Sequence, residues 1–145
     1  MTTRTVLERG RRKAYRPLAV ADRRTAVEAG LGAYERGDWF LAHELLEPAW
    51  MGSDDPAERA LDSGLIKLAA AGVHAVRGNP DGVRKNLIGA RERLASVRSA
   101  ANTLDPDATA ARIDIGGLVA AIDARLEPDA AALLCAAPPP IPRRP

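Results

Sequence analysis

Three ionisable side chains whose types and spacing could do chemistry stand within one short stretch, as His43, Glu44 and Glu47. At 100° per residue, His43 and Glu47 lie one turn apart on the same face of a helix. An imidazole and a carboxylate presented in this way are typical ligands of zinc or iron. The same pair can also move a proton to or from a bound substrate. The residues therefore suggest either a metal site or an acid–base pair.

A metal site needs more ligands than one helical turn supplies. His-Glu-x-x-Glu has the layout of the zinc-binding helix His-Glu-x-x-His, with Glu47 in place of the second histidine. His74 can add a second imidazole, so the metal-ligand candidates are His43, Glu47 and His74. The repeated Glu-x-x-His of di-iron bundles does not occur, and Lys67 would bring a like charge to the place of the cation. We predict no cofactor, and we keep a zinc or iron enzyme, or a metal-free acid–base enzyme, as the alternative.

A structural polar network is the third interpretation of these side chains. The stretch carries no Lys or Arg of its own, and unpaired buried charge is too costly to keep. The carboxylates of Glu44 and Glu47 then need partners from other helices, such as Lys67 and His74. We therefore favour a binding or assembly module whose buried polar cluster consists of His43, Glu44, Glu47, Trp50, Lys67 and His74.

Helical periodicity and helix-ending residues predict the elements that position this cluster. Four of the five aromatic residues lie at or just before the stretch 38–50, which predicts a buried helix there. Gly37 and Gly78 are expected to end helices. Capping residues and apolar stripes indicate further helices over about 20–36, 56–77, 80–99 and 114–126.

These helices predict an all-α fold. Arg36-Gly37-Asp38 and Arg77-Gly78-Asn79 recur 41 residues apart, each between two helices. Two such units are too few for a solenoid. We expect a compact bundle of about five helices, built from two antiparallel helical hairpins with tetratricopeptide-like pairing plus a C-terminal helix.

The helix expected over 56–77 has a face of small residues that another helix can approach closely. We expect the bulky face of the 38–50 helix to pack there, with Trp39, His43, Glu47 and Trp50. This packing predicts that His43 and Glu47 face Lys67 and His74. The small face consists of Ala60, Ser63, Gly64, Lys67, Ala70, Ala71 and His74.

A length of 145 residues fits one domain, with uneven charge along it. Residues 1–17 predict a basic flexible arm, residues 18–128 a helical-bundle domain, and residues 129–145 an Ala/Pro-rich tail. The partner is expected to be another protein or a second copy of the chain. Nucleic acid is a second alternative, because Lys and Arg side chains can bind phosphate backbones. The basic side chains of the arm are Arg4, Arg9, Arg11, Arg12, Lys13 and Arg16.

The composition also bears on location. Cys135 is the single cysteine, so no internal disulfide can form, which favours a reducing compartment. No apolar run reaches the roughly 18 to 20 residues that span a bilayer, and the N-terminus lacks the apolar core of a secretory signal. We expect a cytoplasmic protein without a membrane partner.

Two blocks of the sequence resemble a known helical family, domain of unknown function 309. The first is Ala42-His43-Glu44-x-x-Glu47-x-x-Trp50, preceded by Gly37-Asp38-x-Phe40. The second comprises Gly64 to Ala71, His74 and Arg77-Gly78-Asn79. The resemblance covers roughly residues 20–126, and it implies an all-α fold with no agreed activity. Lys67, where the family typically has Gln, and Pro48 depart from its pattern.

Overall fold

The computed structural model describes the backbone of residues 5–8, 11–14, 18–100 and 112–144. A hairpin of two short strands precedes the helical body, and a 3₁₀-helix follows it. The all-α bundle of about five helices, predicted from the sequence, is confirmed over these residues. The elements are β1 (Thr5–Glu8), β2 (Arg11–Ala14), α1 (Val20–Glu35), α2 (Trp39–Gly52), α3 (Pro56–Val76), α4 (Pro80–Ala100), α5 (Ile115–Leu126) and η3 (Pro128–Leu133).

The α1–α2 and α3–α4 turns have the same backbone construction. Gly37 and Gly78 have φ angles of 76° and 65°, in the left-handed region that glycine adopts at little cost. The residues after them, Asp38 and Asn79, donate their N–H groups to carbonyls five residues earlier, at 2.9 and 3.0 Å. This hydrogen bond is typical of a Schellman motif. The side chains of Asp38 and Asn79 then cap α2 and α4. The two predicted helical hairpins therefore share one type of turn.

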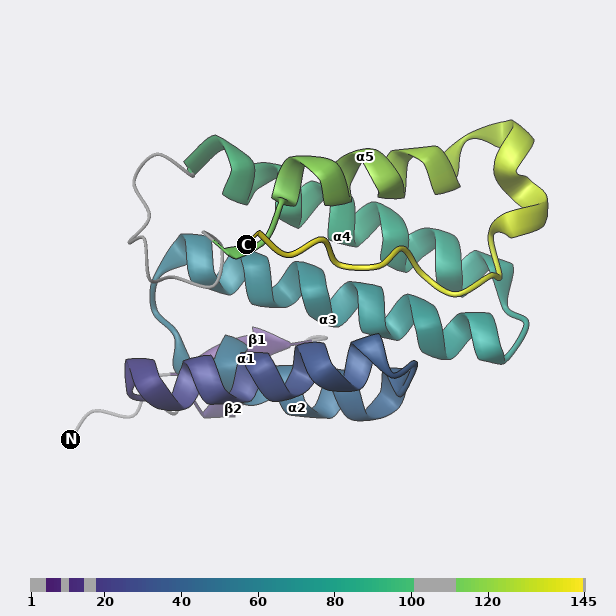
Figure 1. The fold of residues 1–145 in the computed structure, drawn as a ribbon. Coiled ribbons are helices and arrows are strands. Elements are labelled where there is room, and N and C mark those ends of the chain that lie inside the picture. Colours follow the sequence, from purple (N-terminus) through teal and green to yellow (C-terminus); the bar gives the residue numbers. More distant parts are fainter. Residues whose placement is uncertain (1–4, 9–10, 15–17, 101–111, 145) are drawn as a thin grey trace.

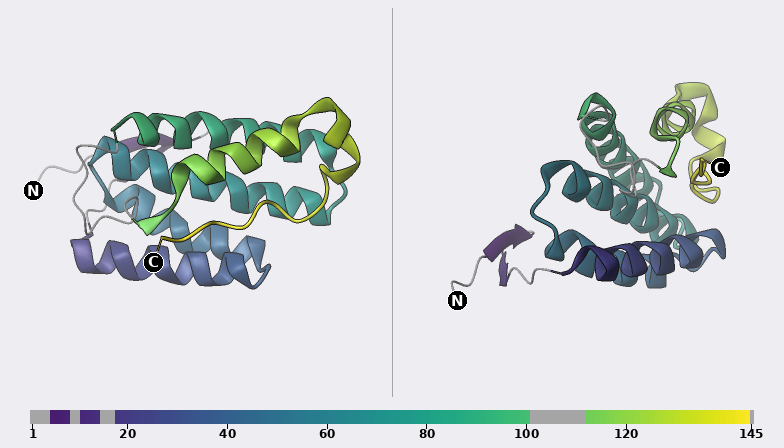
Figure 2. Two further views of the ribbon diagram at one scale, coloured as in Figure 1. Left: turned by 45° about the horizontal axis from the view of Figure 1, so that its top comes forward. Right: turned by 60° about the vertical axis from the view of Figure 1, so that its left-hand side comes forward.

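The helices pack in chain order, with α3 at the centre of the bundle (Figures 1 and 2). One side of α3 contacts α2 and another contacts α4, while α1 packs on α2 and α5 on α4. The apolar stripes predicted for α1, α4 and α5 point into the core. Their buried members are Val27, Leu31 and Tyr34 of α1, Val83, Leu87, Ala90 and Leu94 of α4, and Ile115, Leu118 and Ile122 of α5.

The basic arm contains an antiparallel hairpin that the sequence analysis did not predict. Thr5 pairs with Ala14, and Glu8 pairs with Arg11. The two strands are separated by two residues, the loop length that hairpins favour. Thr5 and Val6 are β-branched and suit a strand. The hairpin lies to one side of the bundle (Figure 2).

The sequence predicts an Ala/Pro-rich tail over residues 129–145, and this tail includes most of η3. The segment after η3 turns back along the helices toward the start of α5 (Figure 1). Leu134 and Ile141 are only 4% and 6% exposed. Ile113 forms an antiparallel bridge with Arg143. The described part of this tail therefore belongs to the packed body of the protein.

Helix α2 contains an interior proline, Pro48, and ends about one turn beyond it, at Gly52. Proline has no N–H group to donate to the preceding turn, so it weakens the helix there. None of the helices in the described residues is long and apolar enough to cross a membrane.

Candidate functional site

The structure brings three of the six candidate residues together on α2. One ligand atom from each of His43, Glu44 and Glu47 lies within 4.8 Å of the other two. His43 Nδ1 is 3.6 Å from Glu44 Oε1. The side chain of His43 is 23% exposed and that of Glu44 is 53% exposed. These three residues, the α2 polar cluster, therefore lie at the edge between the buried and the exposed face of the helix.

The helix presents the cluster in a fixed orientation because its opposite face is anchored in the core. Ala42, Leu46 and Ala49 are all fully buried. Three ligands that include an imidazole and carboxylates can hold a divalent cation and leave a position open. Among the described residues, no other group of three or more His, Cys, Asp or Glu side chains comes as close together.

His74 and Lys67 lie on the side of α3 that contacts α4. His74 Nδ1 is 3.1 Å from Nδ2 of Asn79, and a Cβ at Gly82 of α4 would lie 2.4 Å from the same ring nitrogen. The aliphatic carbons of Lys67 pack on Gly89, where an added Cβ would be 3.3 Å from Cδ. His74 thus belongs to the α3–α4 turn and is not part of the ligand group on α2.

The prediction that the small-residue face of α3 receives α2 is wrong. A Cβ at Gly64, in the middle of that face, would lie 2.8 Å from Cγ of Leu94, so α4 fills this groove. On the side of α3 that faces α2, the absence of a side chain at Gly72 leaves room for the Trp39 ring. A Cβ at Gly72 would lie 2.4 Å from that ring. Helical periodicity identified the residues that share a face. It does not tell which neighbour that face meets, because α3 carries a glycine on both of its packed sides.

Trp50, the remaining candidate, joins the end of α2 to the start of α3. The guanidinium of Arg59 lies 5.1 Å from the centroid of the Trp50 ring. This is the distance of a cation–π contact. The geometry indicates a packing role for Trp50.

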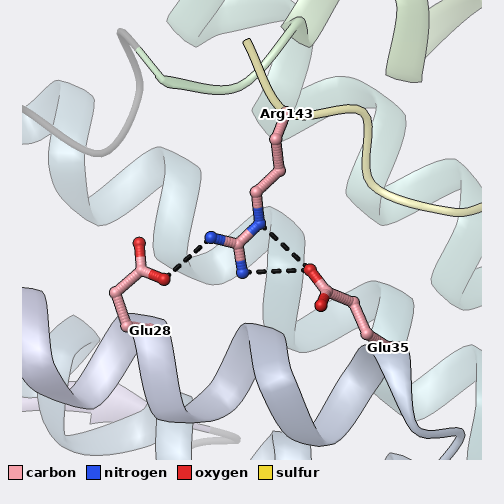
Figure 3. A network of polar contacts seen from close by, with 3 residues as sticks. All are labelled: Glu28, Glu35 and Arg143. Atoms are coloured by element: carbon pink, nitrogen blue, oxygen red, sulfur yellow. Dashed lines mark hydrogen bonds and ion pairs between the residues drawn. The ribbon is translucent and has the colours of Figure 1, made fainter. Parts of the chain in front are cut away.

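A second polar group, absent from the sequence-based candidates, joins the tail to α1 (Figure 3). Arg143 donates from Nε to Glu35 at 3.0 Å and from Nη1 to Glu28 at 2.8 Å. Glu28 and Glu35 are seven residues apart and so lie on one face of α1. In the sequence, this pair of carboxylates on one helix face was the feature that could have suggested a site for a cation. The sequence did not show that a cation 108 residues later would lie between them.

Two aromatic residues at the α1–α2 corner, Tyr34 and Trp39, also lie next to the C-terminal segment. The Tyr34 hydroxyl donates to the carbonyl of Pro139 at 2.7 Å, in a buried position. Burial raises the pKa of Tyr34 above its usual range, so the hydroxyl remains a donor. The Tyr34 and Trp39 rings meet edge to face, with centroids 4.9 Å apart. A cavity of about 280 Å³ lies beside them, lined by Tyr34, Glu35, Trp39, Pro138, Pro140 and Ile141.

A buried carboxyl group, that of Asp62, was not among the candidate residues predicted from the sequence. Asp62 of α3 is 1% exposed, and within the described part of the chain its Oδ1 has no hydrogen-bond partner. Burial, and then the nearby Glu58, raise the pKa of Asp62 well above its usual value, while Arg23 lowers it. In the sequence, Asp62 follows Leu61 and precedes Leu65, and both leucines are fully buried in α3. A carboxyl group next to buried apolar residues was the sequence feature that could have identified it.

Residues 27–86 match the family model described as domain of unknown function (DUF309). The matched segment contains both blocks that carry the sequence resemblance, so the resemblance is confirmed over a narrower range than expected. It runs from within α1 into α4 and includes the α2 polar cluster. No curated protein and no solved structure matches the chain.

Proposed function

We propose that this chain, whose residues 27–86 match the DUF309 family model, is a binding module that holds a partner protein against the outer face of α2. The observation that carries this proposal is an exposed apolar surface next to the polar cluster. Phe40 is 65% exposed and the adjacent Leu41 is 37% exposed. Pro48 is also exposed. We call Phe40, Leu41, Glu44 and Pro48 the α2 outer face.

These four residues form one continuous strip along the helix. At 100° per residue they fall within a 100° sector, opposite the sector that carries Ala42, Leu46 and Ala49. Full burial of an exposed Phe or Leu side chain contributes about 1.5–3 kcal/mol. A partner that covers Phe40 and Leu41 would therefore gain a useful part of its binding free energy from these two contacts.

The charges around the strip indicate the chemistry of the partner. Glu44 lies within it, Glu47 and Asp38 lie beside it, and α2 contains no Lys or Arg. Complementary charge selects partners and speeds their association. The proposed partner is therefore an amphipathic protein segment that combines apolar and basic side chains, such as a basic helix laid along α2.

A titration followed by nuclear magnetic resonance tests this function on the full chain. The probe is an 18-residue amphipathic helical peptide built from Leu and Lys, and the control is the same peptide with Glu in place of Lys. We expect shifts of the backbone signals of Phe40, Leu41 and Glu44 with the basic peptide alone. Equal shifts with both peptides, or shifts centred on another helix, would contradict the proposal.

The α2 polar cluster supports a second candidate function, a metal-dependent or acid–base activity that uses His43, Glu44 and Glu47. The supporting observation is the convergence of their ligand atoms within 4.8 Å. A zinc titration by calorimetry tests the metal site: one bound ion per chain in the wild type, lost in His43→Ala, would support a metal site. An unchanged titration in His43→Ala would reject it.

Two expectations from the sequence remain as proposals. A reducing, cytoplasmic location is supported by the exposed, unpaired thiol of Cys135. Nucleic-acid association through the basic arm is supported by its composition alone. Arg4, Arg9 and Arg16 lie outside the described residues, and only the backbone of Arg11, Arg12 and Lys13 is described.

A further inference from the structure

The proline-rich end of the chain lies on the bundle as a bound peptide lies on a receptor. Pro138, Pro139 and Ile141 are buried. The backbone carbonyl of Pro142 accepts from the N–H of Asp114 at 2.8 Å. Each proline fixes φ near −65°, so a run of prolines is already extended before it binds. Little conformational entropy is then lost when such a segment docks.

Helix α1 and the start of α2 contact this segment through two different kinds of group. At one end, the Tyr34 hydroxyl donates to the Pro139 carbonyl at 2.7 Å, beside the ring of Trp39. At the other end, the carboxylates of Glu28 and Glu35 bind Arg143 (Figure 3). Extended prolines that dock against aromatic side chains are a known mode of peptide recognition. Carboxylates bind a guanidinium through charge-assisted hydrogen bonds.

We propose that Glu28, Tyr34, Glu35 and Trp39 form a binding site for extended proline-rich segments that carry an arginine, and that the chain's own residues 138–144 occupy it. The external ligand is a segment of the same chemistry on another polypeptide. The aromatic rings contact the prolines, and the Tyr34 hydroxyl donates to a backbone carbonyl of the ligand. The two carboxylates bind the guanidinium. This site is separate from the α2 outer face, and the inference does not depend on the proposed function.

The cavity beside Tyr34 and Trp39 shows that the docked segment does not fill the site completely. About 280 Å³ remain next to the docked prolines, between Pro138, Pro140 and the aromatic rings. A ligand with a larger apolar side chain at one of these positions could fill that space. Such a ligand would gain an apolar contact that the chain's own segment does not make.

The docked segment competes with any external ligand. Because it belongs to the same chain, its effective concentration at the site is on the order of millimolar. An external peptide must displace it, so the wild type binds such a peptide weakly. A substitution that weakens the internal contact, but leaves Glu28, Tyr34, Glu35 and Trp39 intact, should expose the site.

Arg143→Glu in the full chain is the substitution that tests the inference. Its new carboxylate is repelled by Glu28 and Glu35, and the receptor residues are unchanged. The probe is a fluorescent octapeptide with the sequence of residues 138–145, and binding is measured by anisotropy. We expect the variant to bind it at least about 10-fold more tightly than the wild type. Adding Glu28→Gln and Glu35→Gln to the variant should remove most of this gain.

Two controls keep the result interpretable. The same octapeptide with Glu at the position of Arg143 should not bind, and circular dichroism should show that each variant keeps its helices. If Arg143→Glu unfolds, Arg143→Gln supplies the comparison, because it removes the charge without adding repulsion. A folded variant that binds no more tightly than the wild type, or that binds both octapeptides equally, overturns the inference.

Discussion

The hydroxyl of Tyr34 donates a hydrogen bond of 2.7 Å to the carbonyl of Pro139, 105 residues further along the chain. The bond is buried, so both groups have given up their contacts with water. Tyr34 also lies at the α1–α2 corner, where its ring meets Trp39. This one contact therefore joins the C-terminal segment to the first helical hairpin.

Tyr34→Phe should lower the free energy of unfolding by about 1–3 kcal/mol, because it leaves the buried Pro139 carbonyl without its donor. Urea denaturation followed by circular dichroism measures the change. Thr25→Ala is a suitable control, since the Thr25 hydroxyl bonds the carbonyl of Ala21 in an exposed position. Its effect should stay within about 0.5 kcal/mol. Equal effects of the two substitutions would show that the Tyr34 bond adds no stability.

Gly72→Ala should destabilise the bundle by about 1–3 kcal/mol. The added methyl would lie 2.4 Å from the ring of Trp39, too close for two packed carbon atoms, so the ring or the helix backbone must shift. Gly32→Ala on α1 is the matched control, because its methyl meets only the flexible end of Arg36 at 3.4 Å. That control should gain up to about 1 kcal/mol from helix propensity. Thermal unfolding of both variants checks the difference, and a Gly72→Ala variant as stable as the wild type contradicts the packing of Trp39 on α3.

Asp62 should make the protein less stable as the pH rises. Because burial raises the pKa of Asp62 in the folded state, the folded chain holds this proton more tightly than the unfolded chain. The resulting stability is fully present below the ordinary aspartate pKa of 3.8, and it is lost as the pH rises through the folded pKa. Asp62→Asn removes the charge and should raise the melting temperature at pH 7.

Melting temperatures of the wild type and Asp62→Asn between pH 4 and pH 8 test this linkage. The advantage of Asp62→Asn should grow with pH over that range. An advantage that stays constant with pH, or a variant less stable at pH 7, would show that Asp62 is charged and paired in the folded protein.

Local features of the sequence were enough to predict the helices. Gly37 and Gly78 follow the last residues of α1 and α3. Ending a helix in this way requires only a left-handed glycine and the hydrogen bonds of one turn. Asp55 caps α3 by accepting from the N–H of Ala57, two residues away. Such signals depend on neighbouring residues, so they can be read without knowledge of the tertiary structure.

Contacts between helices were less accessible to sequence reasoning. The helical wheel correctly placed Gly64, Lys67 and His74 on one face of α3, but that face packs on α4. The choice depends on how side chains such as Leu94 and Trp39 fit the two glycine-containing grooves of α3. Contacts of the reversed C-terminal segment, such as Arg143 with Glu28, depend on the path of the whole chain. The proximity of His43, Glu44 and Glu47 could be expected from the sequence because all three lie on one helix.

The measurement that tests the proposed function most directly is calorimetric titration of the Leu and Lys peptide into wild type, Phe40→Ser and Ile88→Ser. Phe40 lies on the α2 outer face, whereas Ile88, which is 42% exposed, lies on α4 and serves as the control. We expect Phe40→Ser to weaken binding at least about 10-fold, a loss of about 1.4 kcal/mol, and Ile88→Ser to leave it within about twofold. Equal affinities for all three proteins would contradict binding through α2.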